Sequence, residues 1–267
     1  MGIVNVTPDS FSDGGSFQSP EAALRQCEKL LRDGADILDI GGESSRPGSV
    51  PLPLEQERER VLPVLREAVK LGVPVSVDTY KPALMRAALD AGADIINDIW
   101  ALRMGDALQV VAAHPACGVV LMHMQGEPQT MQSAPMDGLA EPQVLSFLKQ
   151  RSEALRGLGV YKSRIVWDAG TGFGKTVAQN FELLAATARL ADAGFAVLAG
   201  WSRKSSLGAV TGLGVEDRLA PSLAAALLAV ERGARIVRVH DVKETVAALK
   251  VWFATVSIAN NQEMALT

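Results

Sequence analysis

The stretch VSVDTYKPALMRAALDAGADIIND (75–98) contains the unit from which the whole chain is built. A short apolar run ends at Asp78, a segment of helical character follows and stops at Gly92, and a second apolar run ends in Asn97 and Asp98. Parallel strands that are buried on both faces appear as continuous Val, Ile and Leu runs, and glycine commonly terminates helices. The stretch therefore predicts a strand, a helix and a second strand parallel to the first.

The same alternation continues in both directions along the chain. Strands are predicted at 2–6, 35–40, 74–78, 94–97, 117–122, 164–168, 195–199 and 235–239. Helices are predicted near 20–33, 54–71, 81–91, 105–114, 140–157, 178–193, 216–232 and 241–255. Eight strands alternating with eight helices in 267 residues match the size of a (β/α)8 barrel, which needs about 250 residues. We expect an α/β protein with a (β/α)8 TIM barrel as a single domain over residues 1–267.

Composition narrows the classes of partner. The chain is 48% hydrophobic and 21% charged with a formal charge of -4, which is typical of a folded globular protein and not of a disordered one. The absence of a Lys/Arg-rich run argues against nucleic acid or an anionic membrane as the main partner. No stretch approaches the roughly 20 apolar residues of a membrane span. Cys27 and Cys117 are interpreted as two buried reduced thiols, which favours the cytoplasm.

Polar residues end several of the predicted strands. In a (β/α)8 barrel the carboxyl ends of the strands form the catalytic face, so Asp78, Asn97 and Asp168 are expected to converge there. Such a set of carboxylate and amide groups can bind a flat ring that presents adjacent donors and acceptors. Capping of the following helices is the alternative, because Asp and Asn are favoured at helix N-caps. Capping could explain one of the three residues and explains all three poorly.

A second group of residues fits phosphate oxygens. Asn5, Arg46, Arg238 and His240 supply neutral and cationic partners, and Arg46 belongs to a long loop over 41–53. Mg²⁺ often takes a single protein ligand while water and substrate phosphates complete its coordination, so Asn5 alone is compatible with a magnesium site. A second long loop, over 123–138, is interpreted either as part of the same active face or as surface structure.

Two segments resemble catalytic motifs without matching them. AGTGFGKT (169–176) approaches the phosphate-binding pattern G-x-x-x-x-G-K-[ST], but Ala169 stands in place of the first glycine. GWSRK (200–204) approaches a nucleophile elbow, but Lys204 replaces its closing glycine. Nucleoside triphosphatase and serine hydrolase activities are therefore disfavoured. Arg203 and Lys204 are better interpreted as cations aimed into a pocket, with a solvated surface position as the alternative for one of them.

A series of motifs spans essentially the whole chain: MGIVNVTPDSFSDGG (1–15), DIGGESSRPG (39–48), SVDTYKP (76–82), IINDI (95–99), LMH (121–123), DAGTGFGK (168–175), GWSRKS (200–205) and RVHD (238–241). In this order the series closely resembles the dihydropteroate synthases of the bacterial folate pathway. The chain differs from the family pattern at Ser45, Ala169 and Thr171. Ser45 keeps the hydroxyl of the usual threonine, whereas Ala169 and Thr171 alter the loop beneath the ring pocket.

The resemblance implies an activity and a set of roles. The family condenses 4-aminobenzoate (pABA) with 6-hydroxymethyl-7,8-dihydropterin diphosphate, with Mg²⁺ as cofactor, and is inhibited by sulfonamides that mimic pABA. By resemblance the pterin site comprises Asp78, Asn97, Met122, Asp168 and Lys204; the diphosphate site Asn5, Arg46, Arg238 and His240, with Asn5 also binding Mg²⁺; and the pABA site Phe11, Ser45, Pro47, Phe173, Ser202 and Lys204. The implied catalytic residues are Asp13, Asp78 and Lys204, and a homodimer through the last helices is expected.

The implied chemistry begins with loss of diphosphate, which leaves a cation delocalised into the pterin ring, and Asp13 is expected to stabilise that cation. Loops over Thr7–Gly14 and Ser45–Gly48 are expected to close and exclude water. One alternative is a pterin-binding methyltransferase with the same ring site, but such an enzyme has no use for the SRPG, SRK and RVH groups. Another alternative is a binding protein without turnover, which would bind the pterin diphosphate and not condense it with pABA.

Overall fold

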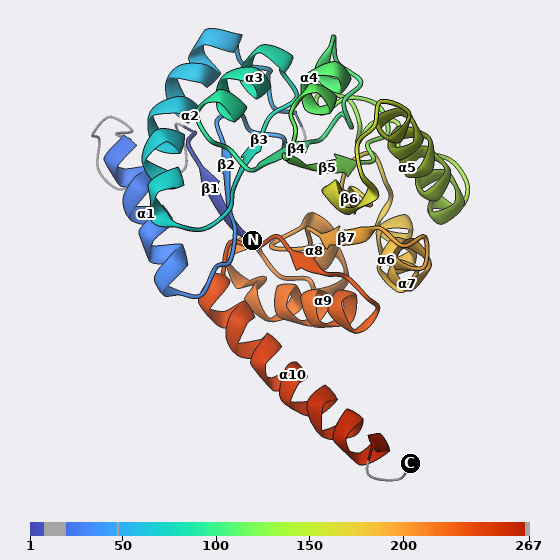
Figure 1. Cartoon of the computed structure of the whole chain (residues 1–267). Helices are drawn as coiled ribbons and strands as arrows, with labels where there is room; N and C mark the ends of the chain where they lie inside the picture. The colour runs from blue at the N-terminus through green and yellow to red at the C-terminus, as the bar shows by residue number, and fades with distance from the viewer. Residues whose placement is uncertain (8–19, 47, 265–267) are drawn as a thin grey trace.

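A computed structural model describes residues 1–7, 20–46 and 48–264, with side chains described as far as residue 257. Eight parallel strands each pair with the next strand in the chain, and Figure 1 shows them at the centre of the molecule with the helices outside them. The strands are β1 (Gly2–Asn5), β2 (Leu38–Gly41), β3 (Val75–Asp78), β4 (Ile95–Asp98), β5 (Gly118–Met122), β6 (Ile165–Asp168), β7 (Ala196–Ala199) and β8 (Ile236–Val237). The predicted alternation of strands and helices is confirmed.

The sheet curls until its first and last strands approach each other. A single parallel bridge joins Gly2 to Val239, just beyond β8. Ile3 N donates to Val239 O at 3.1 Å and Val239 N donates to Met1 O at 3.0 Å. This seam is shorter than the ladders between the other neighbouring strands, where up to four residue pairs are in register. The predicted strand over 235–239 is therefore shortened to two residues of ladder plus this bridge.

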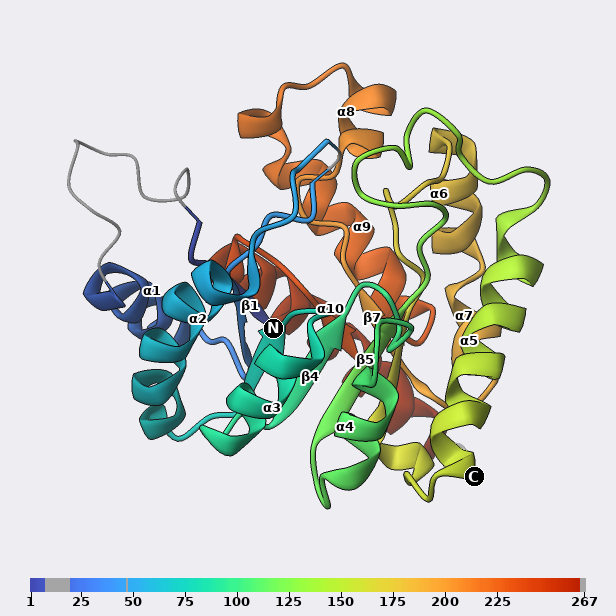
Figure 2. The ribbon, with the colours of Figure 1, turned by 90° about the horizontal axis from the view of Figure 1, so that it is seen from above.

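Most of the helices cover the outer surface of the curled sheet, as Figure 2 shows from above, whereas α10 extends away from it in Figure 1. Among the described residues they are α1 (Pro20–Arg32), α2 (Leu54–Ala68), α3 (Pro82–Asp90), α4 (Ala107–Ala113), α5 (Ala140–Gly157), α6 (Val177–Ala185), α7 (Thr187–Ala191), α8 (Ser205–Thr211), α9 (Leu219–Glu231) and α10 (Val242–Met264), with short 3-10 turns at Val69–Leu71, Lys162–Arg164 and Val215–Asp217. On their inner faces the helices bury aliphatic side chains against the strands, which removes apolar surface from water and stabilises the fold.

Three helix predictions need correction. The predicted helix over 178–193 is divided into α6 and α7, where the Thr187 hydroxyl donates to Leu183 O at 3.2 Å and Leu184 O at 2.9 Å and so competes with the helical pattern. Helix α8 was not predicted, because seven residues ending at Gly212 in the left-handed conformation are too few to show a helical period. The last helix continues to Met264 rather than ending near 255.

The observed strand boundaries differ from the predicted ones, and the local cause is clearest at β2. The predicted strand began at residue 35, whereas β2 begins at Leu38. After α1, Ala35 N donates to Leu30 O at 2.9 Å and Gly34 adopts a φ of 100°, which is the bonding pattern of a glycine-terminated helix. Residues near 35 therefore complete the helix terminus and do not yet pair in the sheet.

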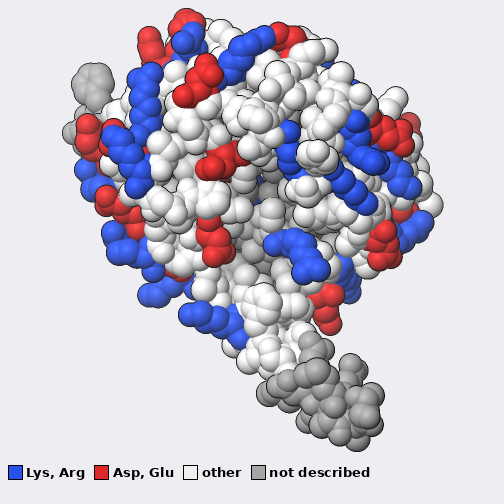
Figure 3. Space-filling view, viewed as in Figure 1, with Lys and Arg blue, Asp and Glu red and all other residues white. Residues whose placement is uncertain are grey.

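Two features bear on the predicted partners. Cys27 and Cys117 are buried free thiols, as predicted. Within the described ranges, no helix is both long and apolar enough to span a bilayer. On the face seen in Figure 3, Lys and Arg side chains are interspersed with Asp and Glu, without a large area of one sign.

Candidate active site

The ends of the first four strands lie level with one another. Asn5 is in register with Gly41, Gly41 with Asp78, and Asp78 with Asn97. Three predicted site residues are thus brought to the same edge of the sheet from segments that are far apart in the sequence.

Arg238 connects these strand ends to the other side of the sheet. Its Nε donates to Asp39 Oδ2 at 2.6 Å and its Nη2 donates to Asp78 Oδ2 at 2.8 Å. Asn97 Nδ2 also donates to Asp39 Oδ2, at 3.2 Å. Asp39 is fully buried, and its Oδ1 has no hydrogen-bond partner among the described residues. Asp39 is not among the predicted site residues, although an acid between the apolar residues Leu38 and Ile40 signals a carboxylate that needs a buried cationic partner.

The charge state of this network follows from its burial. Burial raises the pKa of Asp78 to about 7, and Arg238 acts in the opposite direction. Burial lowers the pKa of Arg238, but Asp39 and Asp78 outweigh it and raise that pKa above its ordinary value. The guanidinium is therefore charged at every physiological pH, and it binds Asp39 and Asp78 through different nitrogens.

Asp168, Lys204 and Phe173 form the opposite wall. Asp168 ends β6, is 9% exposed, and accepts a hydrogen bond from Gly170 N to its Oδ1 at 2.7 Å. Lys204 Nζ lies 4.5 Å from the centre of the Phe173 ring, and burial lowers its pKa to about 8 although Asp168 acts to raise it. Met122, at the end of β5, is buried in one apolar cluster with Phe173. The structure thus brings together a carboxylate, a cation and an apolar surface suited to a flat polar ring.

His240 and Ser202 form a pair beside Arg238. Ser202 Oγ lies 2.9 Å from His240 Nδ1, and His240 N donates to Ser202 Oγ at 3.1 Å. Burial lowers the pKa of His240 to about 4, with Arg238, Arg203 and Arg46 acting in the same direction. The ring is therefore neutral at pH 7, so one of its nitrogens can donate to an anion and the other can accept. Arg46 is exposed on the loop after β2.

The two cations of the GWSRK segment have different environments. Arg203 makes two hydrogen bonds to the carboxylate of Asp241, at 3.0 Å and 2.6 Å. Lys204 is the one that enters the site beside Phe173. Lys204 therefore points into the pocket beside Phe173, whereas Arg203 forms a partly exposed ion pair with Asp241.

A cluster of charged residues anchors the loop that follows β2. Lys81 Nζ donates to Glu43 and to Glu57, and Tyr80 Oη donates to Glu43 Oε1 at 2.9 Å. Leu52 N donates to Glu43 Oε2 at 2.9 Å, so both ends of the loop are fixed. Farther along, Gly48 N donates to Pro128 O at 3.0 Å, and Figure 2 shows this loop beside the 123–138 loop. This contact favours the interpretation of the 123–138 segment as part of the active face.

Ser45 occupies the base of this loop. It is half-buried and shares a small cavity with Asp78, Thr79 and Ile99. The predicted pABA residues therefore divide into four sets: Ser45 lies beside Asp78, Phe173 and Lys204 contact each other, Ser202 contacts His240, and Phe11 and Pro47 lie outside the described residues, as does Asp13.

Helix capping does not account for the strand-end acids. Neither α3 nor α4 has a side-chain cap hydrogen bond at its N-cap, where Lys81 and Asp106 stand, and α6 is capped by Thr176. Asp98 does accept backbone N–H groups, from Trp100 at 2.8 Å and Leu102 at 2.7 Å. Both oxygens of Asp98 therefore fix a turn. Asp168 uses one oxygen in a similar turn, on Gly170 N, and Asp78 accepts a hydrogen bond from Arg238.

The residues present are compatible with a magnesium ion that binds together with a phosphate ligand. In the parts of the chain that the structure describes, no three His, Cys, Asp or Glu side chains are grouped to hold a metal. Asn5 is half-buried at the end of β1 and presents one amide oxygen. An ion held there would have to complete its octahedron with water and phosphate oxygens, which is the usual arrangement for Mg²⁺.

The chain is similar to known proteins over most of its length. Residues 1–240 match the model of the pterin-binding enzyme family. The dihydropteroate synthase of Haemophilus influenzae is 48% identical over 257 residues, which cover 96% of this chain and 93% of that protein.

Solved structures agree with this match. The dihydropteroate synthase of Xanthomonas albilineans with 4-aminobenzoic acid has a TM-score of 0.90 at 50% identity and covers 95% of this chain and 91% of its own. The Yersinia pestis enzyme in complex with a sulfonamide drug has a TM-score of 0.91 at 41% identity, with 96% and 93% covered.

Proposed function

Because the chain belongs to the dihydropteroate synthases of the pterin-binding enzyme family, we propose that the strand-end groups described above are its substrate sites. The chain condenses 4-aminobenzoate with 6-hydroxymethyl-7,8-dihydropterin diphosphate and releases 7,8-dihydropteroate and diphosphate. The observation that carries the site assignment is the convergence of Asp168, Lys204 and Phe173 opposite Asp78 and Arg238.

The pterin is assigned to the space between these two walls. Ionised Asp168 accepts hydrogen bonds from the ring N–H and amino groups, because a carboxylate offers two acceptor oxygens to adjacent donors. Asn97 and Asp78 complete the polar edge, and Met122 packs against the ring face. Lys204 lies where it can donate to a ring acceptor, and Asp168 helps to keep it charged.

The diphosphate is assigned to Arg238, His240 and Arg46. The bond between the pterin methylene carbon and the diphosphate oxygen breaks, and its electron pair leaves with diphosphate while the ring shares the positive charge. Preorganised cations aimed at the departing anion lower the barrier of this step. The pABA nitrogen then bonds to the methylene carbon and loses a proton. Asp13 is proposed to stabilise the cation, and Phe11, Ser45, Pro47, Phe173 and Ser202 are proposed to form the pABA site.

A bound Mg²⁺ would neutralise charge on the diphosphate, and Asn5 is the residue proposed to hold it. We further propose a complete (β/α)8 barrel for the working enzyme with the Gly2–Val239 bridge as its seam, a cytoplasmic location, and competition of sulfonamides with pABA. The last proposal rests on the similarity to the Yersinia pestis enzyme, which was solved with a sulfonamide.

Turnover of the wild-type chain tests the function directly. We expect diphosphate release from the pterin diphosphate to depend on pABA, to yield 7,8-dihydropteroate, and to fall by at least about 10-fold when EDTA removes the metal, because the cation neutralises the leaving group. Diphosphate release and product formation are measured by a coupled phosphate assay and by chromatography.

The alternatives give different outcomes in the same assay. Tight binding of the pterin diphosphate without any product would identify a binding protein. Methyl transfer from a methylated tetrahydrofolate, with no use of pABA, would identify the methyltransferase of the same fold. Full activity in EDTA would remove Mg²⁺ from the proposal and leave the transferase assignment intact.

We also propose that the chain forms a homodimer through its last helices. Helix α10 extends away from the rest of the molecule in Figure 1, and it exposes Val251 by 70% and Phe253 by 57%. Apolar residues grouped in this way are typical of a surface that another chain covers. Sedimentation equilibrium at micromolar concentration is expected to give twice the mass of 28.3 kDa, and Phe253→Asp is expected to shift the protein toward monomer. A wild-type monomer at these concentrations would refute the proposal.

A further inference from the structure

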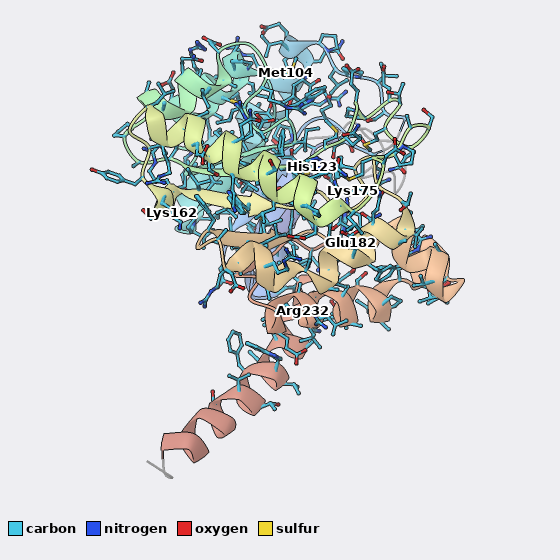
Figure 4. All side chains as sticks on the ribbon, turned by 90° about the vertical axis from the view of Figure 1, so that its right-hand side faces the viewer. Met104, His123, Lys162, Lys175, Glu182 and Arg232 are labelled. Carbon is cyan, nitrogen blue, oxygen red and sulfur yellow. The ribbon has the colours of Figure 1, made fainter. Side chains whose placement is uncertain are left out.

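Lys175, the lysine of the segment that approaches a phosphate-binding loop, does not face a phosphate site. Its side chain is buried at 3% exposure. Its Nζ donates to Gly170 O at 2.9 Å, Phe173 O at 3.1 Å and His123 O at 3.2 Å. An ammonium group has three hydrogens to donate, so all three are used on backbone carbonyls. Figure 4 shows Lys175 and His123 near each other in the interior.

The three carbonyls belong to the segments that carry the site residues. Gly170 N donates to Asp168 Oδ1 at 2.7 Å, and Phe173 N donates to Gly170 O at 3.0 Å. His123 directly follows Met122, and its N donates to Asp168 O at 3.0 Å. The ammonium group of Lys175 therefore lies behind the wall formed by Asp168 and Phe173 and ties the ends of β5 and β6 together.

We propose that Lys175 is a positioning residue that fixes the Asp168 carboxylate and the Phe173 ring in the geometry that the pterin and pABA require. This inference rests on the roles proposed above for Asp168 and Phe173. Lys175 touches neither substrate and acts through the backbone of the β6–α6 loop.

The packing of this loop explains why the fixing group has to be a slender cation. Gly170 and Gly174 have φ values of 68° and 66°. A Cβ added to Gly170 would lie 1.8 Å from His123 O, and one added to Gly174 would lie 2.2 Å from Gln125 O. Two stretches of backbone therefore lie directly against each other, and their carbonyls are brought together without room for larger groups. A single long side chain ending in three donors satisfies them.

Charge supports the same role. Asp168 is faced by Gly170 N–H from its own loop, by Lys204 after β7, by Arg238 after β8 and by Lys175. Burial raises the pKa of Asp168, and these four groups lower it. Burial lowers the pKa of Lys175 itself to about 7, although Asp168 opposes this change. Loss of the lysine removes a positive charge and so raises the pKa of Asp168 further.

The experiment compares Lys175→Met with the wild type. We expect kcat/KM for both substrates to fall by about 10²-fold, because small displacements of positioned groups carry losses of this size. The rise of kcat/KM on the acidic side of the pH profile should also move to higher pH, since Asp168 must be ionised to accept the pterin hydrogens. Lys175→Gln keeps two donors, so its loss should be smaller. A purely structural lysine would lower thermal stability and leave the acidic limb where it was.

Lys162 provides a matched control. Its Nζ also donates to a backbone carbonyl, Ala193 O at 2.9 Å, and lies 4.6 Å from an aromatic ring centre, that of Phe195. Figure 4 shows it far from Lys175, so Lys162→Met should retain wild-type kinetics. An inactive wild type would contradict the proposed function, whereas an active wild type with unchanged kcat/KM and pH profile in Lys175→Met would contradict this inference alone. If Lys175→Met does not fold, the same readouts on Lys175→Gln decide.

Discussion

Asp168→Asn should lower kcat/KM for the pterin diphosphate by about 10³-fold without destabilising the protein. Hydrogen bonds to a charged group contribute about 1.5–3 kcal/mol each, so two of them from the pterin amount to roughly 4 kcal/mol, or three powers of ten. Asparagine keeps the acceptor for Gly170 N but presents an NH₂ donor to the ring donors. Steady-state kinetics and the affinity for the pterin diphosphate measure this loss.

Asp168→Asn should keep or increase the stability of the protein, although it lowers the activity. Burial raises the folded-state pKa of Asp168 above its ordinary value, so the folded state binds more protons than the unfolded state between the two pKa values. Stability contributed by this group therefore falls as pH rises. Asparagine removes that dependence, and the variant should be as stable as the wild type or more so at pH 8, as measured by thermal unfolding.

Asp98→Asn is the matched control for this variant. Asp98 is also a fully buried strand-end acid, and burial raises its pKa to about 7. Its oxygens accept Trp100 N and Leu102 N and do not face the pterin. We expect Asp98→Asn to lower stability by about 1–3 kcal/mol, because one of the two acceptor oxygens is lost and one backbone N–H is left without its partner, and to change the affinity for the pterin little. Equal kinetic losses in the two variants would contradict the assignment of Asp168.

The sequence predicts the arrangement of the fold well because each unit carries its own signals. Apolar runs, terminal glycines and helical spacing are local, and only local information is needed to place strands and helices in alternation. The strand-end acids follow from the same pattern, since parallel strands present their carboxyl ends on one face. Errors occur where a local side-chain bond to the backbone or a short length decides, as at Thr187 and in α8.

The site residues that the sequence misses are those whose role depends on a distant partner. Asp39 is missed because its partner Arg238, itself a predicted site residue, lies 199 positions away, so the sequence does not indicate which cation pairs with this acid. For Lys175 the sequence disfavours a phosphate-binding loop but does not indicate the actual partners of the lysine, which are three backbone carbonyls. Motif spacing specifies which backbone positions are near one another, whereas the direction of a long side chain is set by packing.

Arg238→Met should combine the other large kinetic loss with a loss of stability. Removal of the cation that faces the leaving diphosphate is expected to lower kcat/KM by about 10³-fold. It also leaves Asp39 and Asp78 without their shared partner, and breaking a buried ion pair at one member destabilises a protein by about 4 kcal/mol. Arg238→Lys keeps a charge but not the forked geometry, so its effects should be intermediate. Kinetics and urea unfolding measure the two effects.

The pH dependence of that stability loss identifies its cause. Burial already raises the pKa of Asp78 to about 7, and Arg238 opposes the rise, so without the arginine this pKa moves higher still. When the pKa of an acid is higher in the folded state than in the unfolded state, the free energy of unfolding decreases as the pH rises toward the folded-state pKa. The difference in unfolding free energy between wild type and Arg238→Met should therefore be largest above pH 7 and should shrink as Asp78 becomes protonated below pH 7.

Arg203→Met is the control for the stability loss expected in Arg238→Met. It shows what the loss of another arginine ion pair does to the free energy of unfolding. Arg203 bonds to Asp241 with two hydrogen bonds, but its side chain is 37% exposed, and pairs at the surface contribute at most about 1 kcal/mol. Its stability loss should be small and nearly constant between pH 6 and 9. The outcome that would contradict this account is a stability loss in Arg238→Met that is as small and as independent of pH as the loss in Arg203→Met. It would show that Asp39 and Asp78 are not stabilised by their shared contact with Arg238.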